Sequence, residues 1–229
     1  MSLVARSYLW GRSLHIRNKR RRRGDSEYEL LPMLVKSDKS AVDVGANRGV
    51  YTFPMAERAK HVFAYEPSPW VAGLLKRGAP KNVTVRNFAV SDERKTVTLR
   101  VPIRGDGTLA HNQGSIERYG DEGTASAEVQ AVRLDDEGLE DVGFIKIDAE
   151  DHELPVIRGA RQIILRDKPN LLIEVLGFAG NPRWHPLFDE VTALGYEAYA
   201  LHRGALSPAR SVEHLADGVG LNVIFLPRN

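Results

Sequence analysis

The alternation of strand-length apolar runs with segments of helical spacing is the feature that most constrains the fold of this chain. Between residues 40 and 88 the order is strand, helix, strand, helix, strand. The expected strands are 40–45, 61–65 and 82–88, and the expected helices are 50–59 and 69–76. Strands and helices that alternate at this rhythm form a parallel sheet with right-handed crossovers. The sequence therefore predicts an α/β protein with a doubly wound, mostly parallel sheet.

The middle of the chain interrupts this alternation. Segments 96–103 and 126–133 alternate apolar and polar residues, which predicts two antiparallel strands. The glycine-rich segment 104–124 joins them, and loops of this length are often functional. The alternation then resumes, with strands expected at 143–148, 170–175, 196–201 and 222–226 and helices at 153–164 and 186–194. We therefore expect a basic arm at 1–24 and one domain at 25–229, with a β insertion at about 96–133.

Cysteine content and charge exclude several classes of protein. The chain has 229 residues and no cysteine, which excludes disulfides, thiolate zinc sites, iron–sulfur clusters and a cysteine nucleophile. No apolar run reaches the ~18 residues of a transmembrane helix. Residues 1–24 hold eight basic residues and no acid, while the remainder has 24 basic and 30 acidic residues, a net charge of −6. This distribution argues against a body that binds nucleic acid. We expect a cytoplasmic protein whose arm is a solvated tail or a helix packed on the domain. Contact of the arm with an anionic membrane surface is the alternative, followed by contact with nucleic acid.

A glycine turn follows the first expected strand, in the segment Val42-Asp-Val-Gly-Ala-Asn-Arg-Gly49. Gly45 and Gly49 permit a tight turn and a close approach of the backbone to a ligand, at the sheet edge where ligands bind. The spacing lacks the third glycine of the dinucleotide fingerprint. Asp43 lies just before the turn, where a carboxylate opposes a phosphate and favours a cation. The turn therefore favours S-adenosylmethionine, which carries an ammonium and a sulfonium and has no phosphate.

Two further polar segments follow the second and third strands. Glu66, in Tyr65-Glu-Pro67, lies 23 residues after Asp43, and a carboxylate at this position can accept hydrogen bonds from both hydroxyls of a ribose. The segment Asn87-Phe-Ala-Val-Ser-Asp92 can place a backbone amide or the Asp92 carboxylate against an adenine edge. The alternative for this segment is an ordinary Ser-Asp turn.

A cluster of acidic residues follows the strand at 143–148. In the segment Ile145-Lys-Ile-Asp-Ala-Glu-Asp-His-Glu153, four carboxylates and one imidazole occur within six residues. Such a cluster is costly to assemble unless a cation, a proton or a hydrogen-bond donor lies nearby. Asp151 or Glu153 can alternatively cap the helix that follows.

In their order and spacing these motifs resemble the FkbM family of S-adenosylmethionine-dependent methyltransferases. The resemblance covers about 40–175 and includes Arg158-Gly-Ala160 and Pro169-Asn-Leu-Leu-Ile-Glu-Val175. It implies the class I methyltransferase fold, a Rossmann-like seven-stranded sheet whose last strand runs antiparallel. It also implies methyl transfer to a hydroxyl of a sugar, glycolipid, polysaccharide or polyketide-like acceptor.

The resemblance also implies roles for individual residues. The cofactor would be held by Asp43, Gly45, Asn47 and Gly49 at its methionine part, Glu66 at its ribose, and Asn87, Val90 and Ser91 at its adenine. Asp148 would lie beside the transferring methyl group. The family usually has glycine where this chain has Asp151, and aspartate tolerates a positive φ better than most residues if the turn needs one.

Methylation of an alcohol also requires removal of its proton. We expect His152 to be the general base on intrinsic pKa grounds, with Asp148 as the runner-up and Glu150 as a further catalytic candidate. We predict no metal site, and a magnesium ion held by Asp148 and Glu174 is the alternative. The acceptor is expected under the 104–124 segment, whose hydrogen-bonding residues include His111, Asn112, Gln113, Ser115 and Tyr119.

Other classes of function remain open. One is a binding protein that keeps the cofactor fold without turnover, although the intact acidic cluster argues against it. Another is an NAD-dependent enzyme, against which the missing glycine and Asp43 argue. A nucleic-acid methyltransferase is less favoured because no Asn-Pro-Pro-Tyr type of motif follows the fourth strand. The oligomeric state is not predicted.

Overall fold

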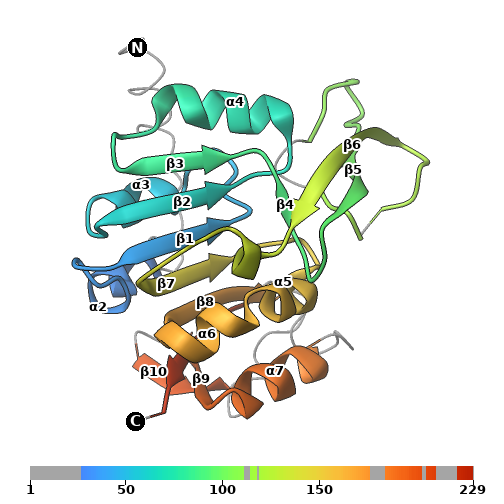
Figure 1. Ribbon diagram of the computed structural model, residues 1–229. Helices are drawn as coiled ribbons and strands as arrows, with labels where there is room; N and C mark the ends of the chain where they lie inside the picture. The colour runs from blue at the N-terminus through green and yellow to red at the C-terminus, as the bar shows by residue number, and fades with distance from the viewer. Residues whose placement is uncertain are drawn as a thin grey trace.

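The computed structural model describes residues 27–110, 114–117, 119–175, 184–202, 205–209 and 221–228, so the arm at 1–24 and His111, Asn112 and Gln113 lie outside the described residues. Its centre is an eight-stranded sheet in the order β10-β9-β11-β8-β7-β1-β2-β3 (Figure 1). The bounds of these strands are β1 (Ser40–Val44), β2 (His61–Tyr65), β3 (Val83–Arg86), β7 (Val142–Ile147), β8 (Asn170–Val175), β9 (Tyr196–His202), β10 (Ala205–Pro208) and β11 (Leu221–Pro227).

The five strands from β3 to β8 run parallel, as the alternation of strands and helices predicts. In the sheet, β1 is the first strand in chain order. β2 and β3 follow it on one side, and β7 and β8 lie on its other side. The carboxyl ends of β1, β2 and β7 therefore meet at one edge, which is the usual ligand edge of such sheets. β11 runs antiparallel between β8 and β9, which confirms the predicted antiparallel last strand.

The sheet has eight strands, so the expected number of seven is wrong by one. The extra strand, β10, pairs antiparallel with β9 at the outer edge, from Ala205 opposite His202 to Pro208 opposite Tyr199. Its sequence, Ala-Leu-Ser-Pro, is too short and too poor in β-branched residues to predict a strand. It pairs because β9 offers an open edge, where a proline is tolerated.

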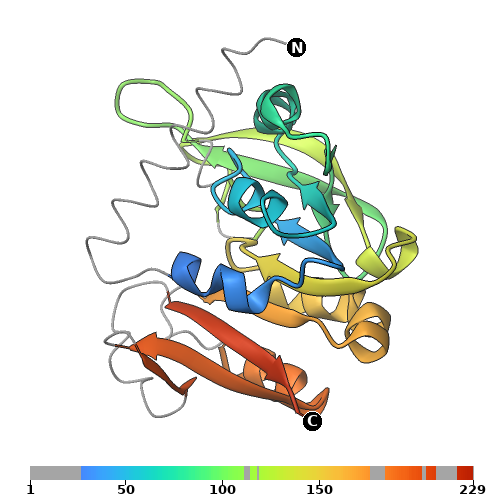
Figure 2. The same cartoon turned by 90° about the vertical axis from the view of Figure 1, so that its left-hand side faces the viewer.

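Helices cover both faces of the sheet, as a doubly wound fold requires (Figures 1 and 2). On one face lie η1 (Glu27–Leu30), α2 (Leu31–Leu34) and α3 (Thr52–Ala56), which pack against Phe144, Leu172 and Ile224. α4 (Pro69–Gly78) packs beside α3 through Leu75 and Phe53. On the other face lie α5 (Glu153–Gly159), α6 (Arg161–Asp167) and α7 (Trp184–Ala193). No helix in the described part of the chain is long and apolar enough to cross a membrane.

The helix predicted at 153–164 is two helices, because the chain breaks at Ala160. A Cβ atom on Gly159 would overlap the carbonyl oxygen of Ser91, so the end of α5 lies directly against the turn after β4 (Ala89–Val90). α6 then begins at Arg161, and Asp135 accepts hydrogen bonds of 3.1 Å from the backbone N–H groups of Gln162 and Ile163. The break therefore follows from a long-range contact and a side-chain cap.

The middle of the chain forms a separate three-stranded sheet in the order β4-β6-β5, with β5 (Lys95–Pro102) and β6 (Thr124–Val132). β5 and β6 pair antiparallel along their whole length, which confirms the predicted pair. β4 pairs parallel with β6. It has only two residues, which is too short for its sequence to predict a strand. The small sheet stands beyond the carboxyl ends of β1, β2 and β3 (Figure 1).

Candidate active site

A cavity lies between the carboxyl edge of the main sheet and the small sheet. The main sheet lines it with the ends of β1 and β2 and the turns after β1, β2 and β7, and the small sheet contributes Leu99 and the segment 114–116. From the predicted cofactor set, Gly45, Asn47, Glu66 and Val90 line this cavity. All three catalytic candidates, Asp148, Glu150 and His152, also line it. The fold thus brings the separate motifs of the sequence to one place.

The glycine turn after β1 is shaped by a close approach to β7. Gly45 has a φ of +74°, and a Cβ atom at this position would overlap the carbonyl oxygen of Asp148. The backbone N–H groups of Gly45 and Ala46 donate to the carbonyl oxygen of Tyr65 at 2.9 and 3.0 Å. Asn47 follows with a φ of 49°. The turn is therefore joined to the ends of both neighbouring strands.

Glu66 lies on the cavity wall beside this turn. Its Oε2 accepts a hydrogen bond from the backbone N–H of Asn47, and its Oε1 accepts one from the backbone N–H of Ser68, both at 2.8 Å. Burial raises the pKa of Glu66 to about 7, although these two backbone hydrogen bonds oppose the shift. The carboxylate is therefore fixed in orientation, and its oxygens keep lone pairs for a ligand.

Asp43 lies behind the turn and does not line the cavity. Its side chain is buried and accepts a hydrogen bond from Oγ1 of Thr52. Burial raises the pKa of Asp43 to about 6, which Thr52 and the ammonium of Lys146 oppose. Gly49, with a φ of +82°, also lies away from the cavity, where a Cβ atom would collide with Phe53.

The segment after β3 contributes a wall and two supporting residues. Val90 lines the cavity beside Phe88. The side-chain amide of Asn87 donates to the carbonyl oxygens of Glu66 and Pro67 at 2.9 and 2.8 Å, so it holds the turn that presents Glu66. Ser91 is fully buried, outside the cavity lining.

The turn after β7 has a left-handed backbone at two successive residues, Glu150 (φ 50°) and Asp151 (φ 80°). Position 151 therefore does need the positive φ that glycine would supply. Glu153 closes the turn, because its Oε1 accepts hydrogen bonds from the N–H groups of Ala149 and Asp151 at 3.1 and 3.2 Å. Burial raises the pKa of Glu153 to about 7.

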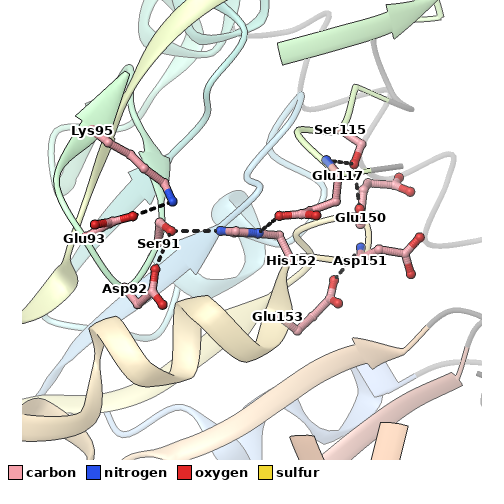
Figure 3. A network of polar contacts seen from close by, with 10 residues as sticks. All are labelled: Ser91, Asp92, Glu93, Lys95, Ser115, Glu117, Glu150, Asp151, His152 and Glu153. Carbon is pink, nitrogen blue, oxygen red and sulfur yellow. Dashed lines mark hydrogen bonds and ion pairs between the residues drawn. The ribbon is translucent and has the colours of Figure 1, made fainter. Parts of the chain in front are cut away.

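His152 is held by hydrogen bonds at both ring nitrogens (Figure 3). Nδ1 lies 3.0 Å from Oε1 of Glu117, which belongs to the small sheet's 114–117 segment, and Nε2 lies 2.9 Å from Oγ of Ser91. Burial lowers the pKa of His152, which the neighbouring Glu117 opposes. A second bond joins the same elements, from Oγ of Ser115 to the carbonyl oxygen of Glu150 at 2.7 Å. Of the other predicted acceptor residues, Ser115 lines the cavity and Tyr119 does not.

Lys146 is the site residue that the sequence reasoning missed. It is fully buried in β7, and its Nζ lies 3.9 Å from Oδ2 of Asp148 and 4.0 Å from Oε2 of Glu174. Nζ also donates to the carbonyl oxygen of Ile147 at 3.0 Å and lies 5.1 Å from the ring centre of Tyr51. A lysine in an otherwise apolar strand, two residues before an aspartate and hence on the same face, is the signal that could have revealed it.

The doubly wound sheet, the glycine turn after β1 and the acidic residue after β2 together define the class I methyltransferase architecture. Among solved structures, the chain resembles an FkbM methyltransferase from Methylobacillus flagellatus KT, with a TM-score of 0.53 and 19% identity. That alignment covers 83% of this chain and 44% of the solved one. An rRNA methylase from Streptococcus thermophilus shares the fold with a TM-score of 0.51, at 12% identity over 88% of this chain and 93% of the other. A Streptococcus mutans protein solved in complex with SAH has a TM-score of 0.50, at 9% identity over 86% and 93% of the two chains.

The sequence model described as "Methyltransferase FkbM domain" matches residues 43–198. The chain therefore belongs to the FkbM methyltransferase family. A curated relative, described as a probable ribosomal RNA small subunit methyltransferase A from Pyrobaculum islandicum, is 41% identical over 63 residues. That match covers 28% of this chain and 27% of the relative, so the chain spans less than half the length of this relative and of the Methylobacillus flagellatus protein.

Proposed function

We propose that this protein transfers a methyl group from S-adenosylmethionine to a hydroxyl oxygen of a sugar, glycolipid, polysaccharide or polyketide-like acceptor. The observation that carries the proposal is the position of two carboxylates, Glu66 and Asp148, on one cavity on either side of the Gly45 turn. Two carboxylates bind hydroxyl groups and positive charge, and they repel a phosphate.

The residues present fit this cofactor. Glu66 accepts hydrogen bonds and would hold the ribose hydroxyls, while Phe88, Val90 and Leu99 provide apolar walls for an adenine ring. Asp148 would lie beside the positively charged end. When bound, S-adenosylmethionine supplies a methyl group on a sulfonium sulfur that an oxygen nucleophile can displace. Alignment of the acceptor oxygen then contributes much of the rate.

We assign proton removal to Asp148 and a positioning role to His152. Both nitrogens of His152 are engaged, and Nε2 is directed at Ser91 outside the cavity lining. A substrate hydroxyl would have to displace Ser91 before it could reach this imidazole. Asp148 lines the cavity with a side chain that is 32% exposed, so an acceptor can reach it. Glu150 is a further candidate on the same wall.

An RNA acceptor is the second candidate, because the curated relative is described as an rRNA methyltransferase. The match covers about a quarter of each chain, and residues 25–229 carry a net charge of −6. A protein that neutralises phosphates with lysine and arginine needs the opposite charge balance. These observations favour a neutral hydroxylated acceptor.

Calorimetric titration with S-adenosylhomocysteine, beside NAD, tests the cofactor half of the proposal. We expect micromolar binding of S-adenosylhomocysteine and none of NAD. A Glu66→Ala variant should bind roughly 10- to 100-fold more weakly, because hydrogen bonds to a charged group contribute about 1.5–3 kcal/mol. The matched control is Glu128→Ala, which removes an exposed carboxylate of β6 and should leave the affinity unchanged. Absence of S-adenosylhomocysteine binding to the folded wild-type protein would overturn the proposal.

A further inference from the structure

Four polar residues lie on one face of the main sheet at the edge beside the cavity. Lys146 and Asp148 are two residues apart at the end of β7, so they share a face. β8 runs beside β7 (Figure 1). The two strands are parallel with Ile173 opposite Ile147, which places Glu174 beside Asp148. Asn222 of β11 lies directly opposite Glu174 in the antiparallel register. Residues paired in this way have side chains on the same face with Cβ atoms about 4.5–5.5 Å apart.

Asp148 and Glu174 form an acidic pair beside the ammonium group of Lys146. Two neighbouring carboxyl groups disfavour simultaneous ionisation, so each makes the other easier to protonate. The pKa of Asp148 is raised well above its ordinary value, chiefly by burial and further by Glu174, while Lys146 opposes the shift. The ammonium of Lys146 lies within 4.0 Å of both groups. Lys146 thus supplies a positive charge beside both carboxyl groups.

Asn222 is the observation that points to a ligand. Its side chain is buried, with 6% exposed, and its Oδ1 has no hydrogen-bond partner among the residues that the structure describes. Buried polar atoms are almost always paired, because an unpaired one costs free energy. A free acceptor next to Glu174 suits a donor that arrives with a substrate, and a hydroxyl is such a donor.

Resting on the proposed function, we infer that Asp148, Glu174 and Asn222 form the acceptor site, which takes a neutral compound with neighbouring hydroxyls, such as a sugar ring. Glu174 and Asn222 accept hydrogen bonds from one hydroxyl or from two adjacent ones, and the Asp148–Glu174 pair receives the proton of the reacting hydroxyl. The side chains of Asp148 and Glu174 are 32% and 17% exposed, so a ligand can reach them.

The charge of the site determines the class of acceptor. Three acidic residues, Asp43, Asp148 and Glu174, lie near one lysine, so the acidic groups outnumber the cation. An acceptor that carries a carboxylate or phosphate would be repelled, whereas neutral hydroxyls satisfy the carboxylate and amide oxygens. This places the acceptor over β7, β8 and β11, and not only under the 104–124 segment.

The chemical step balances with these groups. The acceptor oxygen bonds to the methyl carbon while the carbon–sulfur bond breaks, and its electron pair stays on sulfur, which becomes a neutral thioether. The hydroxyl proton moves to the carboxyl pair and is later released to water. No oxidant, reductant or metal ion is needed.

Ligand-observed NMR on the protein saturated with S-adenosylhomocysteine tests this site without knowledge of the natural acceptor. The probes are methyl glycosides of mannose, galactose and glucose, beside the negatively charged methyl glucuronide. We expect millimolar binding of at least one neutral glycoside and binding of the glucuronide that is weaker by about tenfold or more. Glu174→Gln and Asn222→Ala should each weaken the neutral probe by about tenfold. Glu197→Gln, an exposed change on β9, should not.

The variants must bind S-adenosylhomocysteine within about twofold of wild type, which shows that they are folded. If no neutral glycoside binds at tens of millimolar, or if both site variants bind it as tightly as wild type, the inference is wrong. Retained binding of S-adenosylhomocysteine in that case would leave the proposed function standing. Loss of that binding in the wild-type protein would instead remove the proposed function and the inference with it.

Discussion

At the residue scale, Gly45 sets the distance between two motifs of the site. Its backbone has a φ of +74°, and a side chain there would overlap the carbonyl oxygen of Asp148. The glycine turn after β1 and the acidic turn after β7 can therefore meet only when position 45 has no side chain. Conformation and space both require glycine here, and the two requirements can be separated by mutation.

We expect Gly45→Ala to lower the free energy of unfolding by about 2–5 kcal/mol. A left-handed backbone costs a non-glycine residue about 1–2 kcal/mol, and forcing an atom into a packed region costs about 1–3 kcal/mol more. Gly107→Ala is the matched control, because Gly107 has a φ of +80° but open space around it, and it should cost only about 1–2 kcal/mol. Urea unfolding followed by circular dichroism measures both. Equal losses would show that the contact with Asp148 contributes nothing.

At the element scale, α5 ends at the point where the main domain contacts the small sheet. α5 ends at Gly159 against the carbonyl oxygen of Ser91, and Ser91 in turn contacts His152 at the start of α5. The Arg158-Gly-Ala160 motif thus allows one helix to approach the turn that carries Val90 to the cavity. Helical periodicity alone predicts a continuous helix here, because it carries no information about this contact.

Substitution of alanine for two helical glycines should change the stability of the protein in opposite directions. Gly159→Ala should destabilise the protein by about 1–3 kcal/mol, because the new methyl group collides with backbone at Ser91. A methyl group at Gly73, in α4, would approach only an arginine side-chain nitrogen, at an ordinary contact distance. Gly73→Ala should therefore stabilise the protein by about 0.5–1 kcal/mol, because alanine has the higher helix propensity. Thermal unfolding of the two variants beside the wild type measures both signs. Stabilisation by Gly159→Ala would contradict the close approach.

At the scale of the whole molecule, two sheets enclose one cavity, and hydrogen bonds cross between them. Glu117 and Ser115 of the small sheet's 114–117 segment contact His152 and the Glu150 carbonyl of the main domain (Figure 3). The segment lines the cavity itself, so these bonds hold one of its walls in place. Access to the cavity therefore depends on how firmly the two sheets are joined.

We expect Glu117→Ala to speed the release of S-adenosylhomocysteine by roughly fivefold, with little change in global stability. The Glu117 side chain is 42% exposed, so its bond to His152 contributes only about 1 kcal/mol after screening by solvent. Hydrogen exchange at residues 114–117 should rise by a similar factor. Asp121→Ala is the control, since Asp121 pairs with Arg100 within the small sheet at 2.8 Å. Stopped-flow dissociation and hydrogen-exchange mass spectrometry measure the two effects, and equal behaviour of the two variants would disprove the role of Glu117.

The parallel strands, the two antiparallel strands of the insertion and the edge positions of Glu66 and Asp148 could be predicted from the sequence, because periodicity and strand-end turns are local properties. The positive φ at Asp151 could be anticipated for the same reason. Several features could not. β10 needs the open edge of β9, and the break after Gly159 needs Ser91.

The sequence by itself determined which motifs reach the carboxyl edge of the sheet, since each follows a strand directly. Only the tertiary structure decided which side chains face the cavity. Asp43 turns to Thr52, and His152 is engaged by Glu117 and Ser91, which lie 35 and 61 residues away in the chain. The neighbours of Lys146 likewise depend on strand order, and so does the Asn222 oxygen that has no partner among the described residues. The physical reason is that hydrogen bonds and burial depend on residues distant in sequence, whereas strands and turns depend on adjacent ones.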